Sequence, residues 1–341
     1  MAVTKTQRLT YILNRLWNTV FVLLVISFVI FVFVRAIPGD PVITLLGDEG
    51  ATQEQYEEMR KNLGLDKPIL LQYAKWMGRI VQGNFGNSIT TSEKVLPLIL
   101  QKFKATVELA VVGVLLGSIL GIIAGVISAV KKDTIFDNLS MFLSMAGMAM
   151  PVFWMGLLLI IGLSVQLDWF PIGGMISHET RLEPVTGFVL LDAIITGDME
   201  SLKDILKHLL LPALTLGVRP AALTARTTRA SMLEVINEDY IKAGLARGLY
   251  FWEVLAKHAF RNSLIPVVTV IGLQIGTYLG GSIVTETVFS WPGLGRYVVT
   301  AIYDRDYTVI QGAVLIYAFI IVMINLCVDL LYSYIDPRVK L

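Results

Sequence analysis

The sequence predicts an all-α integral membrane protein with six transmembrane helices, and three observations lead to that prediction. Hydrophobic residues make up 55% of the 341 residues and charged residues only 16%, whereas soluble domains carry about 25% charged residues. The chain contains six long apolar runs, and crossing the hydrocarbon core takes roughly 20 such residues. Lysines and arginines gather in alternate connections between these runs. This composition excludes an ordinary soluble domain and a disordered chain.

We expect the apolar runs to be helices, because backbone groups in lipid must be hydrogen-bonded within their own segment. The first run is longer than the apolar core of a signal peptide and has a poor cleavage site at its end, so we expect it to remain as a helix. Pro151, Pro212 and Pro220 permit kinks in the third and fourth runs. The six predicted spans are Trp17–Val34, Thr106–Val130, Leu139–Leu167, Leu209–Thr224, Ser263–Val288 and Val309–Leu331.

Basic residues predict the orientation, since cytoplasmic connections are enriched in lysine and arginine. With six spans, four segments fall on one side: the N-terminus, the turn at Lys131 and Lys132, the connection between spans four and five, and the C-terminal tail. Each of them carries lysine or arginine, whereas the loop 168–207 on the other side is acidic. We therefore expect both termini in the cytoplasm.

The hydrophilic segment after the first span is expected to be an extracytoplasmic helical insertion. Thr52 with Gln55 fits a capping box at a helix N-terminus, and Gly64 fits the C-terminal cap of that helix. Pro68 opens a second helix and Gly83 follows it. About 70 ordered residues are too many for a simple connector.

A second hydrophilic segment, residues 226–262, is predicted as helix, turn, helix on the cytoplasmic side. Its helices are Met232–Ala246 and Phe251–Phe260, with a break at Gly248. The expected division of the whole chain is 1–34 (N-terminus and first span), 35–105 (insertion) and 106–341 (a core of five helices that contains residues 226–262).

Glycines at a spacing of four residues predict close helix packing in two spans, because small residues let helix backbones approach each other in lipid. This spacing suits a movable helix pair around a pathway and a static packing seam equally well. The glycines are Gly113, Gly117, Gly121 and Gly125 in the second span, and Gly272, Gly276 and Gly280 in the fifth.

Three polar residues inside the spans are candidates for a translocation pathway. Arg219 lies well inside the fourth run, where a charge costs about 2.5–3.5 kcal/mol. It either faces a cavity and meets a carboxylate, or its helix continues past the membrane and the side chain reaches the interface. Glu286 either faces a passing cation or caps a local turn. Gln274 completes the candidate set.

Several kinds of chemistry have no signature in the sequence. A net charge of +1 argues against a nucleic-acid partner. There is no P-loop motif, no paired-histidine zinc motif and no nucleophile elbow with a nearby base. Cys327 is the single cysteine, so it forms no internal disulfide. We expect no catalytic residues, no metal site and no cofactor in this chain.

The cytoplasmic segment 226–262 carries apolar residues at helical spacing among its charges, which predicts a partner surface. Its sequence resembles the EAA loop of ABC importer permeases, closest to the B-type dipeptide or oligopeptide permeases of the peptide/nickel subfamily. Lys242 replaces the glutamate of the general EAA pattern, and the proline follows later, at Pro266. The stretches that carry the resemblance are Asp239–Gly248, Lys257–Pro266, Pro38–Pro41, Gly83–Ser88, Glu286–Gly295, Asp329–Tyr332 and Asp336–Arg338.

The resemblance implies a type I ABC importer-like permease fold in a bacterial or archaeal plasma (inner) membrane. The implied partners are a homologous second permease, two cytoplasmic ABC ATPases that bind ATP and Mg, an extracytoplasmic peptide-binding protein and membrane lipid. The loop would couple the ATPases to the spans, and the binding protein would deliver peptides. The implied coupling residues are Tyr240, Lys242, Ala243, Gly244, Ala246, Arg247, Gly248, His258, Arg261 and Asn262.

Other functions remain open at this point. Nickel and metal-chelate importers share this type of permease. An ion-coupled secondary transporter is a further alternative, although we see no internal repeat and Arg219 is the one plausible buried charge. An intramembrane enzyme lacks a nucleophile–base pair, and a purely structural protein does not need a docking helix.

Overall fold

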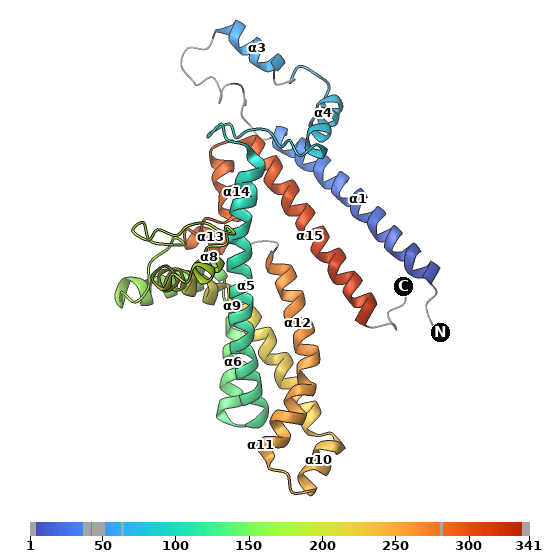
Figure 1. Ribbon diagram of the computed structural model, residues 1–341, viewed down its shortest axis with the longest axis vertical. Helices are drawn as coiled ribbons and strands as arrows, with labels where there is room; N and C mark the ends of the chain where they lie inside the picture. The colour runs from blue at the N-terminus through green and yellow to red at the C-terminus, as the bar shows by residue number, and fades with distance from the viewer. Residues whose placement is uncertain (1–4, 37–41, 43–51, 63–64, 280–281, 336–341) are drawn as a thin grey trace. The chain divides into compact units, whose positions relative to one another are not determined.

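The computed structural model describes residues 5–36, 42, 52–62, 65–279 and 282–335, which form helices with no β-strand among them (Figure 1). Gly64, Gly280 and the stretches 38–41 and 336–338 lie outside these residues. The chain divides into two compact units, residues 1–103 with 297–341, and residues 104–296.

The first unit is built on two long helices that pack along each other, α1 (Lys5–Ala36) and α15 (Tyr307–Ile335). Helices α3 (Gln53–Asn62) and α4 (Ile69–Val81) lie between them in the sequence, and α4 packs on α1. Phe31 on α1 meets the rings of Tyr73 and Trp76 on α4, each with a centroid distance of 5.4 Å. Aromatic contacts therefore join the segment after the first span to that span.

The predicted caps of this segment are confirmed where the structure describes them. The Thr52 amide donates to Gln55 Oε1 at 3.0 Å, and the Gln55 amide donates to Thr52 Oγ1 at 3.3 Å, which completes the capping box. Pro68 precedes α4, and Gly83 follows it with a φ of +77°.

Asp306, at the start of α15, holds the turn that follows α4. Its Oδ2 accepts hydrogen bonds from the Ser88 hydroxyl at 2.6 Å and from the Ile89 amide at 2.9 Å. The amide and the hydroxyl of Thr90 donate to the same oxygen. Oδ1 accepts from the Val309 amide and so caps α15. One buried carboxylate thus joins two segments more than 200 residues apart.

The second unit surrounds α9 (Met199–Ile236), which packs against helices before and after it in the chain. Its other elements are the remainder of α5 (Val95–Val130), α6 (Ile135–Ala149), α7 (Val152–Leu159), the π-helix η1 (Ile160–Gln166), α8 (Val189–Thr196), α10 (Asp239–Ala246), α11 (Phe251–Val254), the π-helix η2 (Leu255–Phe260), α12 (Arg261–Leu279), α13 (Ile283–Val288) and the start of α14 (Leu294–Tyr303).

Among the described residues, four helices are long and apolar enough to cross a membrane: Trp17–Ala36, Val95–Val130, Phe251–Leu279 and Tyr307–Ile324. Helices α6 and α7–η1 are together apolar enough to cross a membrane, but they are bent by 110° at Pro151. They add a fifth crossing if the bent pair counts as one span. The described helices therefore support a multi-pass membrane protein. The predicted fourth span falls within α9, which does not combine high hydropathy with few charges over a membrane-spanning length as those helices do.

Two acidic residues of the loop 168–207 accept hydrogen bonds from the loop itself. Asp192 accepts from the Thr186 amide and hydroxyl and from the Gly187 amide. Asp204 accepts from the amide and hydroxyl of Ser177. Although burial by itself raises the pKa of both carboxyls, these hydrogen bonds outweigh it and hold each pKa below its ordinary value.

Candidate functional site

Residues 237–260 fold as a short hairpin, which we call the α10–α11 hairpin, at the end of α9 (Figure 1). Asn237 and Glu238 separate α9 from α10, so the single predicted helix Met232–Ala246 is wrong: it is two helices. Glu238 has extended dihedrals (φ −66°, ψ 146°), which stop one helix before the next begins. Gly248 makes the reversal with a φ of +84°, a conformation that L side chains rarely adopt. From Phe251 the chain runs through α11 and η2 into α12 without a break.

The inner face of the hairpin packs on the membrane-proximal helices. Ile241, Val254, Leu255 and Ala259 form one buried cluster with Ala129 of α5 and Met232 of α9. Asn262 Nδ2 donates to the Tyr240 hydroxyl at 2.9 Å and so ties the start of α12 to α10. The cluster therefore joins the hairpin to both long helices.

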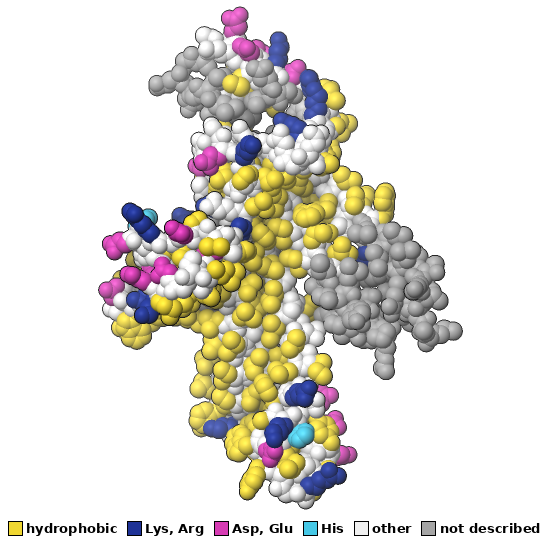
Figure 2. All heavy atoms as spheres, viewed as in Figure 1, with side chains coloured by type: hydrophobic (Ala, Val, Ile, Leu, Met, Phe, Trp, Pro, Cys, Tyr) yellow, Lys and Arg dark blue, Asp and Glu magenta, His cyan; other side chains and the backbone are white. Residues whose placement is uncertain are grey.

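The outer face of the hairpin is apolar and exposed. Tyr250 is 81% exposed, Trp252 68% and Phe251 45%. The rings of Phe251 and Trp252 meet edge to face at 5.4 Å. Figure 2 shows charged side chains gathered around this end, whereas hydrophobic side chains cover the length of α5 and α6. Large exposed aromatic side chains amid charges are typical of a protein-binding surface.

The structure brings the ten predicted coupling residues together on the hairpin and at the start of α12. Nine of them are exposed, and Gly244 is half-buried. Lys242 pairs with Asp239 at 3.1 Å and is solvent-exposed. Leu255 and Phe260, two of the apolar residues of this segment, contribute to the inner cluster and not to a partner surface. Tyr250 and Phe251 are not among the predicted coupling residues, although Leu249–Trp252 is a run of four large hydrophobic residues in a charged segment.

The three candidate pathway residues do not form one cluster. Arg219 is exposed on α9, and no described carboxylate lies within ion-pair distance of it. Gln274 of α12 is buried and donates to Thr224 Oγ1 of α9 at 3.3 Å. Glu286 is completely buried.

Glu286 organises the turn between α13 and α14. Its Oε1 accepts from the Thr106 hydroxyl at 2.7 Å, and its Oε2 accepts from the Arg296 amide at 2.9 Å. Thr106 Oγ1 in turn accepts from the Leu294 amide at 2.8 Å. A Cβ at Gly293 would overlap the Glu286 carboxyl group, which explains this glycine. The geometry gives Glu286 the capping role rather than a place along an open pathway.

The glycines of α5 lie in a seam with α9. A Cβ at Gly121 would lie 2.5 Å from the Ala221 carbonyl oxygen, and one at Gly125 would lie 2.6 Å from that of Ala225. Gly117 faces Gly217 backbone to backbone, and Gly113 faces Ala213 and Leu216. In contrast, Gly272 of α12 has open space where its Cβ would be. Gly272 therefore differs in its surroundings from the glycines of α5.

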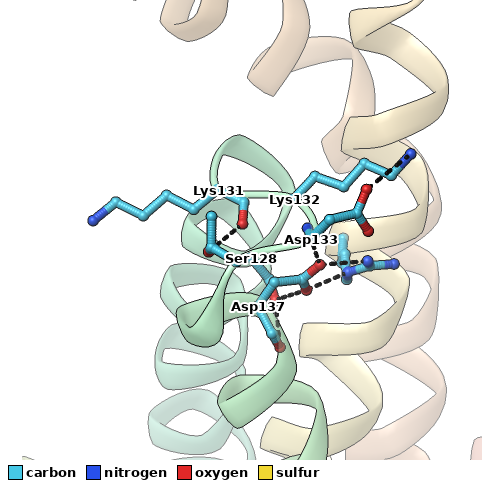
Figure 3. A network of polar contacts seen from close by, with 7 residues as sticks. Ser128, Lys131, Lys132, Asp133 and Asp137 are labelled. Carbon is cyan, nitrogen blue, oxygen red and sulfur yellow. Dashed lines mark hydrogen bonds and ion pairs between the residues drawn. The ribbon is translucent and has the colours of Figure 1, made fainter.

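An ion pair between Asp137 of α6 and Arg229 of α9 lies beside the α5–α6 turn (Figure 3). Arg229 of α9 donates from Nε and from an Nη atom to the two oxygens of Asp137, at 2.7 and 2.6 Å. Ser128 of α5 and the Asp133 amide also donate to this carboxylate. Asp137 is buried, so the bidentate pair fixes α6 to α9 one turn from the hairpin's inner cluster.

With this geometry established, comparison with known proteins identifies the family. The profile of the binding-protein-dependent transport system inner membrane component matches residues 117–341, and that of its N-terminal region matches residues 8–110. The chain belongs to this family. It is therefore a membrane transport component rather than an enzyme.

Individual relatives match this permease over almost its whole length. The di/tripeptide transport system permease protein DppB of Pseudomonas aeruginosa is 42% identical over 332 residues, covering 97% of this chain and 99% of its own. The dipeptide transport system permease protein DppB of Escherichia coli K12 is 43% identical over 335 residues, with the same coverage. That of Haemophilus influenzae is 42% identical over 330 residues, again with this coverage.

Proposed function

We propose that this chain is one of two membrane-spanning subunits of an ATP-driven importer of short peptides. The relatives named above transport dipeptides or tripeptides, and the full-length match supports the same class of substrate here. In this proposal α9 supplies the sixth span, both termini are cytoplasmic, and residues 35–105 and 168–207 lie outside. A separate binding protein delivers the peptide, and a homologous permease forms the other half of the pathway.

The α10–α11 hairpin is the observation on which this proposal depends. It offers Tyr250, Phe251 and Trp252 to a cytoplasmic partner, while its inner face is packed on α5 and α9. An ATPase that holds the outer face would move both helices when it closes on ATP. The ATP state then changes the relative free energies of inward-open and outward-open forms, which is alternating access by population shift.

Arg219 and Gln274 lie on α9 and α12, the two helices that the hairpin connects. In the proposed pathway the exposed guanidinium of Arg219 binds a carboxylate of the peptide, since charge-assisted pairs of this kind are strong.

The hairpin is tested by Trp252→Ala in the complete transporter, with Trp169→Ala as the control. Trp169 is 61% exposed in the loop 168–207, and Trp252 is 68% exposed on the hairpin. Since an aromatic anchor contributes about 2 kcal/mol or more to an interface, we expect Trp252→Ala to weaken ATPase binding about 30-fold. ATP-dependent uptake into proteoliposomes is measured alongside, with dipeptides, tripeptides and a nickel chelate as substrates.

Trp169→Ala should leave ATPase binding unchanged. Equal ATPase affinity in the two variants contradicts the docking role of the hairpin. Uptake of the nickel chelate alone contradicts the assignment of peptides, while leaving the hairpin's role intact.

A further inference from the structure

A groove of about 650 Å³ lies between α5, α6, α7 and α9. Of the residues that line it, only Ser140 and Ser144 carry a hydroxyl group, and the others are hydrophobic or glycine. Leu120, Ile123 and Leu143 on its walls are 45–59% exposed, so the groove is open along its side. Pro151 turns α7 away from α6 by 110°, and small residues of α5 and α9, among them Gly121 and Ala221, line the groove.

The side chain of Lys131 places a positive charge at one end of this groove. Lys131 Nζ lies 4.2 Å from the ring centroid of Phe136, and Phe136 lines the groove. Lys132 points the opposite way (Figure 3) and lies 3.9 Å from Asp133. Asp137, the other acid of the turn, is neutralised by Arg229. Among the described residues, no carboxylate lies within ion-pair distance of Lys131.

The groove has the depth of one membrane leaflet. From Gly117 to Ile127, its lining residues on α5 extend over ten residues, or about 15 Å at the helical rise. This is half of the roughly 30 Å hydrocarbon core. Lys131 lies one turn beyond Ile127, so a groove that spans one leaflet would place it at the level of the headgroups. Basic residues at this level on the cytoplasmic side attract anionic lipids.

We propose that this groove is a binding site for an anionic glycerophospholipid, with one acyl chain along α5 and the phosphate on Lys131. The inference rests on the proposed orientation, in which the α5–α6 turn is cytoplasmic. The occupant is a lipid rather than a helix of another subunit because the apolar lining ends at an unpaired cation, a combination that matches an acyl chain joined to a phosphate.

The test uses the complete transporter in nanodiscs of phosphatidylcholine and phosphatidylglycerol. Either lipid in turn carries a photoreactive group at the end of one acyl chain, and labelled residues are mapped by mass spectrometry. We expect labelling of Leu120, Met155 and Leu159 at the deep end of the groove. Lys131→Gln should reduce labelling by the phosphatidylglycerol probe about fivefold, which corresponds to about 1 kcal/mol per lysine near the surface. Labelling by the phosphatidylcholine probe should not change.

Two matched controls keep the test decisive. Lys132→Gln removes the neighbouring charge that points away, and it should leave labelling unchanged. Ala124→Trp fills the groove and should abolish labelling, whereas Ile119→Trp changes an exposed residue of α5 outside the groove and should not. Labelling without preference for the groove, equal effects of the two lysine variants, or a groove protected by a neighbouring subunit would each overturn the proposal. Because the readout is lipid labelling, the result does not depend on whether peptides are transported.

Discussion

Adding one methyl group at Gly125 tests whether the α5–α9 seam is a tight structural contact. A Cβ at this position would lie 2.6 Å from both the Ala225 carbonyl oxygen and the Thr228 Cβ. Ordinary non-bonded contacts are about 3.5 Å, so the helices must separate by about 1 Å. The atoms it meets are backbone or close to it and cannot rotate away. Overpacking of this kind costs about 1–3 kcal/mol, and we expect about 3 kcal/mol because Gly121 on the same seam is equally close.

Gly272→Ala is the matched control for Gly125→Ala, since no atom lies within 4 Å of its added Cβ. We expect it to leave stability unchanged or to raise it by up to about 1 kcal/mol, because alanine is the better helix former and its Cβ meets no neighbour. Thermal unfolding of the purified full-length chain in one detergent measures both variants. Equal midpoints for Gly125→Ala and Gly272→Ala would refute the distinction between the α5–α9 seam and the open position at Gly272.

Two further predictions concern charged groups of the second unit. Asp137→Asn should destabilise the chain by about 3 kcal/mol. This is the low end of the cost of breaking a buried ion pair, because Arg229 is 26% exposed. Thermal unfolding at the same midpoint as the wild type would contradict this expectation. The pKa values of Asp192 and Asp204 are lowered in the folded chain. Their stabilisation is therefore complete above the unfolded pKa of about 3.9 and is lost as pH falls through the lower folded value. Hydrogen exchange of residues 177–192 should accelerate, relative to the intrinsic rate, only below about pH 4, and acceleration already at neutral pH argues against these hydrogen bonds.

Local signals in the sequence predicted local structure well. The capping box at Thr52 and Gln55 and the glycine after α4 both depend on neighbouring residues alone, and the structure confirms them. The long apolar runs likewise predicted the all-helical class and most of the membrane-crossing helices. The broken helix Met232–Ala246 was missed because neither Asn237 nor Glu238 is a strong helix breaker.

Contacts distant in sequence could not be predicted in this way. From the sequence, Glu286 could either face a passing cation or cap a turn. Its hydrogen bonds to Thr106 and to the start of α14 select the capping role. Gly272 belongs to a row with the same spacing as the α5 glycines, yet its Cβ position is open, whereas the α5 glycines meet the neighbouring α9. Similarly, two adjacent lysines look alike in sequence, and the turn sends only Lys131 to the apolar groove.

The sequence by itself determined the all-helical membrane class and the position of the α10–α11 hairpin, because hydropathy and helix propensity are properties of neighbouring residues. Only the tertiary structure decided which face of that hairpin is exposed, which glycines meet a neighbouring helix and which buried acids are already paired. These depend on packing between segments separated by up to 218 residues, and no local pattern specifies which segments will meet.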